Sequence, residues 1–158
     1  MFRRTLLLLA VASLPILHAA PPPDLPQKYM LNLAAVKIMV AAAEAEAQKR
    51  SVQVTICIMD ENSNILFLQK ADGAGMNTIQ FAQRKARHSA TYRQPSKVAA
   101  DSLKTGNLGI LAQPDAFPNQ GGLPIRFNGV VIGAIGVSGA PSEVDEAIGQ
   151  VAIDALLK

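Results

Sequence analysis

The strongest structural signal in this chain is a stretch near its C-terminus where Asn128-Gly129 alone separates two apolar runs. These runs are LPIRF, residues 123–127, and VVIGAIGV, residues 130–137. Asn-Gly is the preferred pair for a two-residue type I′ turn, because both positions need a positive φ. The segment is therefore predicted to be a β-hairpin. Its second strand carries Gly133 and Gly136, where another backbone, a helix or a flat ligand could approach closely.

A helix is predicted to follow this hairpin. After the Gly-Ala-Pro break at residues 139–141, Ser142 is placed to be the N-cap, with Glu143, Asp145 and Glu146 in the first turn. Acidic side chains are favoured at the positive end of the helix dipole. The dipole therefore explains these acids without a bound cation.

Residues 1–20 are predicted to be a secretory signal peptide. Arg3 and Arg4 form a positive start, residues 5–17 are largely apolar, and small residues follow at Ala19 and Ala20. These thirteen residues are too few to span a bilayer, which needs about 20. The mature protein is therefore expected to be periplasmic or secreted.

An uncleaved membrane anchor is the alternative for these residues. Cleavage after Ala20 would put His18 at position −3, where a small residue is usual, and Pro21 at position +1. On either interpretation, residues 21–28 are expected to form an extended, proline-rich leader and residues 29–158 a single domain.

Charge and cysteine content narrow the function classes. Arg3 and Arg4 belong to the predicted signal peptide, which leaves a net charge of +1 from the 15 Lys and Arg and 12 Asp and Glu of the whole chain. With no basic run and no aromatic-interleaved basic patch, nucleic-acid binding is not expected. Cys57 is the only cysteine, so it is interpreted as a small buried hydrophobe, and covalent c-type haem attachment is excluded.

The order of predicted elements indicates the fold class. Helices are expected over residues 29–50, 77–93, 96–103 and 142–157, strands over 52–59, 65–70, 123–127 and 130–138, and a loop over 105–120. In the first helix, an apolar stripe of five residues is expected to face the core: Leu33, Val36, Val40, Ala43 and Ala47. This order favours an α/β (α+β) fold in which helices flank an antiparallel sheet.

Two segments of the chain resemble the GlcG/HbpS family of haem-binding-type proteins, which is related to the C-terminal part of PduO. One is GGLPIRFNGVVIGAIGVSG, residues 121–139, and the other combines Lys85-Ala86-Arg87 with YRQPS, residues 92–96. The resemblance extends back to about Leu31. It implies a profilin-like layered sandwich and a symmetric homo-oligomer, and a membrane sensor partner is possible by analogy.

The candidate cofactor site lies on the helix predicted over residues 77–93. One helical stripe and its flanks carry the six candidate residues: Phe81, Arg84, Lys85, Arg87, His88 and Tyr92. An imidazole can ligate haem iron, aromatic rings can cover the macrocycle, and cations can pair with the propionates. Because residues 21–158 contain no other histidine, His88 is the only candidate for a metal-ligating imidazole. The second stripe, which includes Ala82, Ala86 and Ala90, is expected to pack on the sheet.

Each candidate also has a structural interpretation. His88 could be a surface or hydrogen-bonded residue, Tyr92 a packing residue, and Lys85 a solvated cation. In the family the position after Lys-Ala-Arg is often threonine, so the resemblance implies that His88 lies near haem with a ligation mode of its own. Three hypotheses remain open: an exported haem-binding protein for sensing, storage or scavenging, an auxiliary factor or enzyme for a small hydroxy-acid or diol, and a ligand-free oligomeric scaffold. The export signal and the lack of an acid–base constellation favour a binding protein over a catalyst.

Overall fold

The computed structural model describes residues 23–158, so the predicted signal peptide, residues 1–20, lies outside the described residues. In this part of the chain, no helix has the length and apolar character needed to cross a bilayer. The elements follow the predicted order: α1 (Leu33–Lys49), β1 (Thr55–Asp60), β2 (Ile65–Lys70), α2 (Thr78–Tyr92), α3 (Ser96–Lys104), the 3₁₀ helix η1 (Leu108–Ala112), β3 (Gly122–Phe127), β4 (Val130–Ser138) and α4 (Ser142–Leu156).

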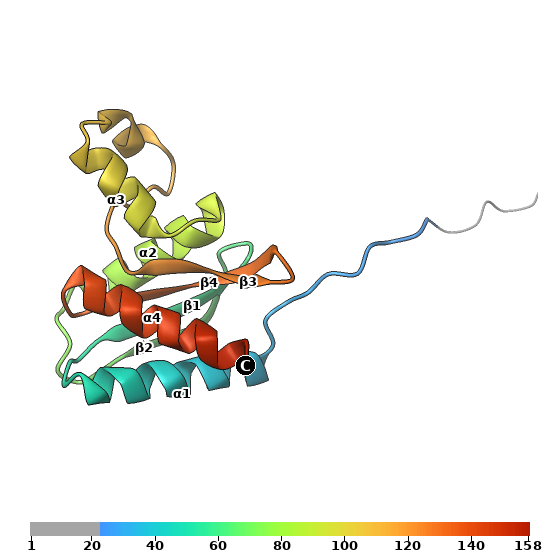
Figure 1. Cartoon of the computed structure of the whole chain (residues 1–158), viewed down its shortest axis with the longest axis horizontal. Coiled ribbons are helices and arrows are strands. Elements are labelled where there is room, and N and C mark those ends of the chain that lie inside the picture. The colour runs from blue at the N-terminus through green and yellow to red at the C-terminus, as the bar shows by residue number, and fades with distance from the viewer. Residues whose placement is uncertain (1–22) are drawn as a thin grey trace, which may run out of the picture.

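The four strands form one antiparallel sheet in the order β2-β1-β4-β3 (Figure 1). The predicted C-terminal hairpin is confirmed, because β3 pairs with β4, and Asn128 and Gly129 have the positive φ values of 49° and 79°. β1 pairs with β2 on one side and with β4 on the other, with Thr55 opposite Ser138. The expected fold class, an antiparallel sheet flanked by helices, is confirmed.

Helices cover both faces of the sheet. α1 and α4 lie on one face and α2 on the other (Figure 1). Successive side chains of a strand point to opposite faces, so Ile56 and Ile58 join the large core under α1 and α4, whereas Cys57 and Met59 contact α2. The sheet therefore has a thick aliphatic core on one side and a thin interface with small residues on the other.

The close contact between α2 and the sheet depends on small residues, glycine in the strand and alanine in the helix. A Cβ atom added at Gly136 would lie 2.1 Å from the carbonyl oxygen of Ala82 and 2.6 Å from the backbone nitrogen of Ala86. Both alanines are fully buried, as the predicted packing stripe requires. At Gly133 an added Cβ would instead lie 2.4 Å from the carbonyl oxygen of Met59 in the neighbouring strand and 2.5 Å from the Leu31 side chain. Gly136 thus admits the backbone of a helix, one of the predicted alternatives.

The first helix is shorter than predicted. It begins at Leu33 rather than Tyr29, because the side chain of Asn32 caps it by accepting a hydrogen bond from the Ala35 backbone N–H at 2.8 Å. Tyr29 instead packs its ring edge-on against Phe127, with 4.9 Å between ring centroids. Leu33 is 64% exposed, so the expected stripe is wrong at this position and confirmed at the other four.

The prediction that Ser142 is an N-cap is wrong, and Ser96 is not an N-cap either. Pro141 and Pro95 take the N-cap positions of α4 and α3, and Ser142 and Ser96 are the first helical residues. Ser96 has a different task, because its Oγ accepts a hydrogen bond from the Gly122 backbone N–H at 2.9 Å. This contact joins the start of α3 to the start of β3.

Candidate functional site

Lys85 lies on the side of α2 that faces the N-terminus of α4. Its Nζ donates hydrogen bonds to Asp145 Oδ2 at 2.8 Å and to the Val137 carbonyl oxygen at 2.9 Å, and Lys85 and Asp145 are each 1% exposed. The interpretation of Lys85 as a solvated cation is therefore wrong. Asp145 also does more than complement the helix dipole, because its Oδ1 accepts from the Ala140 backbone N–H at 3.0 Å.

The Lys85–Asp145 ion pair links helices that lie on opposite faces of the sheet. Burial lowers the pKa of the Lys85 ammonium, and the hydrogen bond and charge of Asp145 oppose this shift. With its charge enclosed in this way, Lys85 presents no cation to a ligand on the outer surface of α2. The described contacts give Lys85 the task of holding α2 in place, and haem contact by Lys85 stays a prediction without support in these contacts.

His88 lies at the next turn of α2 and is completely buried, so its interpretation as a surface residue is wrong. The backbone N–H of Phe117 donates to His88 Nδ1 at 3.1 Å, whereas Nε2 is buried without a hydrogen-bond partner. A neutral imidazole carries one proton, and Nδ1 is already an acceptor, so the proton belongs on Nε2. The imidazole is therefore an Nδ1 acceptor with an unpaired Nε2–H donor.

His88 is covered by a segment that we call the strap, residues 113–118. Within the strap, the ring of Phe117 lies under the Arg84 guanidinium, 4.2 Å from its central carbon, and edge-on to Phe81, with 5.4 Å between centroids. The Tyr92 hydroxyl donates a hydrogen bond to the Pro114 carbonyl oxygen. The predicted residues Phe81, Arg84, His88 and Tyr92 are thus brought together, and each contacts the strap.

Arg87, also on α2, is not among the residues that hydrogen-bond to the strap or stack on Phe117. Its side chain is exposed, and its charge acts on the buried thiol of Cys57. Burial nevertheless raises the pKa of Cys57 to about 12, so the thiol stays protonated and unreactive. The interpretation of Cys57 as a small buried hydrophobe is confirmed.

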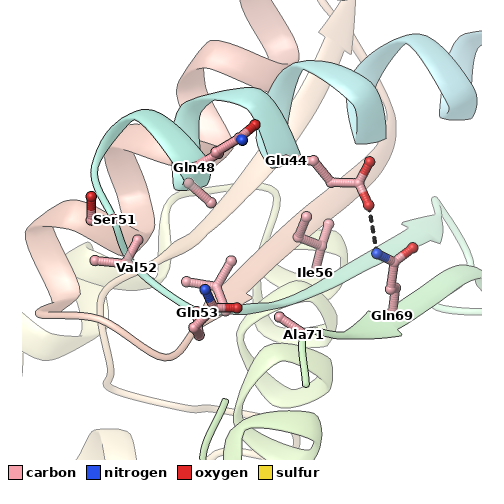
Figure 2. A pocket seen from close by; sticks show the side chains of 10 residues that line it. Glu44, Gln48, Ser51, Val52, Gln53, Ile56, Gln69 and Ala71 are labelled. Carbon is pink, nitrogen blue, oxygen red and sulfur yellow. Dashed lines mark hydrogen bonds between the residues drawn. The ribbon is translucent and has the colours of Figure 1, made fainter. Parts of the chain in front are cut away.

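A separate pocket of about 410 Å³ lies between the C-terminal end of α1 and the strands β1 and β2 (Figure 2). Exposed polar side chains, among them Gln48 and Gln53, surround an apolar floor that includes Ile56, and Gln69 donates a hydrogen bond to Glu44 (Figure 2). None of the six predicted site residues lines this pocket. It is therefore distinct from the group around His88.

The side chains around His88 are of the chemical types that hold haem, but their arrangement does not fit an imidazole–iron bond. A histidine that ligates a metal uses an unprotonated nitrogen and donates a hydrogen bond from the other. His88 shows the reverse, because Nδ1 accepts from Phe117 and the proton belongs on Nε2. Phe117 also closes the ring off from solvent. His88 is therefore not arranged as an axial ligand while the strap is in place.

The fold and these residues together define the class of protein. It is a small α+β domain in which an antiparallel sheet lies between the helix pair α1 and α4 and the helix α2, which carries a buried imidazole. Within that class, the chain belongs to the HbpS-like family, whose description is "Haem degrading protein HbpS-like" and whose model matches residues 31–154. The matched residues run from the segment before α1 to near the end of α4. They confirm the resemblance noted in the sequence.

Individual relatives agree with this assignment. The chain is 34% identical over 128 residues to an uncharacterised 15.0 kDa protein of Citrobacter freundii, covering 78% of this chain and 90% of that protein. It is 30% identical over 111 residues to Protein GlcG of Escherichia coli K12, covering 70% and 83%. Its fold matches a crystal structure of a doubly substituted HbpS from Streptomyces reticuli with a TM-score of 0.77 and 30% identity, covering 92% and 98%.

Sequence reasoning missed two residues that complete this part of the molecule, Asp145 and Phe117. Asp145 had a sufficient local explanation in the helix dipole, and nothing near it in the sequence points to Lys85. Phe117 lies in a loop with few periodic signals. The only usable signal was the length of that loop, because long ordered loops are often functional.

Acidification should destabilise the protein through His88. Burial lowers the pKa of this imidazole, so below a pH of about 6.5 the unfolded chain binds a proton that the folded chain does not. The contribution of His88 to the free energy of unfolding is therefore fully present above that pH. Below it, the free energy of unfolding falls by at most about 1.4 kcal/mol per pH unit, until the pH reaches the pKa of His88 in the folded protein. Urea unfolding of residues 21–158 at pH 7.5, 6.5 and 5.5 measures this loss.

The matched variant for this measurement is His88→Asn, which keeps an acceptor near the position of Nδ1 but has no proton to gain. All other titrating groups are common to both proteins, so the difference in their pH dependence belongs to His88. Equal slopes in the two proteins would contradict the prediction.

Proposed function

We propose that this protein is an exported haem-binding protein that acts in haem sensing, storage or scavenging. The observation that carries the proposal is the buried imidazole of His88 with an unpaired Nε2, which lies against the Tyr92 ring and beneath Phe117. Phe117 in turn contacts the Phe81 ring and the Arg84 guanidinium. Membership of a family described by haem chemistry supports the same ligand. The two exposed arginines of α2, Arg84 and Arg87, are suited to the propionate groups.

Export is the part of the proposal that rests on sequence alone. The positive start, the apolar run of residues 5–17 and the small residues before Pro21 are the pattern of a secretory signal. A periplasmic or secreted location would keep the protein away from cytoplasmic hydroxy-acid and diol metabolism. A homo-oligomer and a membrane sensor partner belong to the proposal on the same footing, by analogy with the family.

A haemin titration followed at the Soret band tests the ligand. Residues 21–158 contain every described helix and strand, so this chain is titrated beside His88→Ala and the control Gln48→Ala, whose side chain lines the separate pocket of Figure 2. We expect saturable one-to-one binding by the parent and the control. His88→Ala should bind at least tenfold more weakly or lose the low-spin spectrum.

The other outcomes of this titration also decide the question. Saturable binding that is identical in His88→Ala would keep haem as the ligand and move the axial group to Tyr92 or to a neighbouring subunit. If none of the three proteins binds saturably, the haem proposal is wrong and small metabolites become the next ligands to test.

Haem degradation is a second candidate, because the description of the family names it. Binding and degradation differ in what happens to the Soret band after saturation. A stable band in the presence of a reductant and dioxygen indicates a binding protein. Progressive bleaching with release of iron that a ferrous chelator captures, absent in His88→Ala, would instead indicate turnover.

A further inference from the structure

We propose that the strap, residues 113–118, occupies the ligand position on α2 and must leave it before His88 can ligate iron, so that Phe117 controls entry to the site. This inference rests on the proposed haem-binding function and adds to it how the site is kept closed. It follows from the disagreement between the chemistry of the residues and their arrangement. Three features of the molecule support it: the proton on His88, the position of the Phe117 ring, and the small number of hydrogen bonds that hold the strap.

The first feature is the position of the proton on the His88 imidazole. As long as the Phe117 backbone N–H donates to Nδ1, the neutral ring carries its proton on Nε2 and has no free lone pair there. Removal of the strap frees the Nδ1 lone pair, which can then take the iron directly; alternatively, the proton can move to Nδ1 through solvent and leave the lone pair on Nε2. Nε2 becomes available as an iron ligand only in this second tautomer. Strap position and ligating ability are therefore coupled at a single ring.

The second feature is the position of the Phe117 ring, because Phe117 is only 9% exposed. It has a guanidinium, that of Arg84, over one face and the edge of the Phe81 ring against it. A cation over a π-face is a favourable contact, and so is an edge-to-face pair of aromatic rings. A flat aromatic macrocycle with carboxylate groups could take over both contacts once Phe117 has left. Phe117 thus acts as an internal occupant of the position.

The third feature is the small number of hydrogen bonds that hold the strap against α2. Its direct hydrogen bonds to α2 are the one from the Phe117 N–H to His88 and the one from the Tyr92 hydroxyl to the Pro114 carbonyl. Residues 113–115 are exposed, so the first half of the strap adds little buried contact that would hold it in place. Beyond the strap, Ser96 Oγ donates to the Asn119 carbonyl at 2.7 Å. The strap can therefore open from Asn119 without unfolding β3.

Stopped-flow mixing with excess haemin tests the strap. If opening precedes binding, the observed association rate levels off as the haemin concentration rises, and the plateau equals the opening rate. Tyr92→Phe removes one hydrogen bond from the strap and keeps the ring against His88, so the plateau should rise about fivefold. Tyr29→Phe is the matched control, because it removes a tyrosine hydroxyl that contacts Asn128 rather than the strap, and it should leave the plateau unchanged.

A second measurement needs no haem. His88 is the only histidine in residues 21–158, so its two ring nitrogens can be read by ¹⁵N NMR without assignment. We expect the proton on Nε2 in the ligand-free protein. A ligand-free ring with its proton on Nδ1 would overturn the proposal whatever haemin does.

The outcomes separate this inference from the function on which it rests. Saturable haemin binding with a rate that rises linearly, and equally in Tyr92→Phe and Tyr29→Phe, would overturn the strap and leave the haem-binding function intact. Absence of saturable binding in all variants would remove both. A plateau that rises in Tyr92→Phe alone supports both.

Discussion

Replacing Lys85 with methionine should lower the free energy of unfolding by about 3–5 kcal/mol, because the substitution leaves the Asp145 carboxylate buried without its cation. Methionine fills a similar volume and cannot donate to Asp145 or to the Val137 carbonyl. The loss is therefore electrostatic and polar rather than a loss of packing. Urea unfolding at pH 7.5, followed by far-ultraviolet circular dichroism, measures it.

Two further variants make this prediction specific. Lys97→Met removes the lysine of a surface ion pair with Asp101, whose side chains are each 45% exposed, and should change the unfolding midpoint very little. Adding Asp145→Asn to Lys85→Met removes the unpaired charge while an amide oxygen can still accept from Ala140. This double variant should recover part of the loss. A Lys85→Met protein as stable as the parent would show that the pair does not hold α2.

Gly136→Ala should lower the free energy of unfolding by about 3 kcal/mol, the upper end of the usual cost of overpacking, and is expected to leave little folded protein. The added methyl group would meet the backbone of α2 at 2.1 and 2.6 Å, and backbone atoms within a helix cannot turn aside as a flexible side chain can. The helix would have to move away from β4, which opens the thin interface around Cys57 and Met59. Yield of soluble protein and thermal unfolding report the effect.

Gly75→Ala is the matched control for this substitution. An added Cβ at Gly75 meets only side-chain atoms, at 3.4 and 3.6 Å, which are ordinary contact distances. This variant should fold and melt close to the parent. If Gly136→Ala melts there as well, the close approach of α2 to β4 is not present in solution.

The hairpins were predictable because their signals are local. Asn128-Gly129 specifies a turn through the backbone preferences of two residues, and alternation assigns the faces of β1 within a few positions. The start of α1 was not predictable in this way. Helical propensity near Tyr29 is overridden by the packing of its ring on Phe127, a residue nearly a hundred positions away.

The candidate site was predictable as a helix face but not as a set of contacts. Helical spacing placed Phe81, His88 and Tyr92 together, and the structure keeps them together under the strap. Lys85 shares that stripe but lies at its edge, where it turns toward α4. Its partner Asp145 is 60 residues away, and the partner of His88, Phe117, is 29 residues away. No local pattern encodes such pairings.

The central pairing of the sheet has a consequence for how the chain acquires its fold. β1 lies between β2, its neighbour in the chain, and β4, so Thr55 finds Ser138 only after most of the protein has been synthesised. Contacts between distant residues require a large loop to close first, which slows folding. The N-terminal half therefore has no sheet that it can complete on its own as it leaves the ribosome. We therefore expect the sheet of a nascent chain to stay incomplete until residues 130–138 are available, which would suit the proposed export.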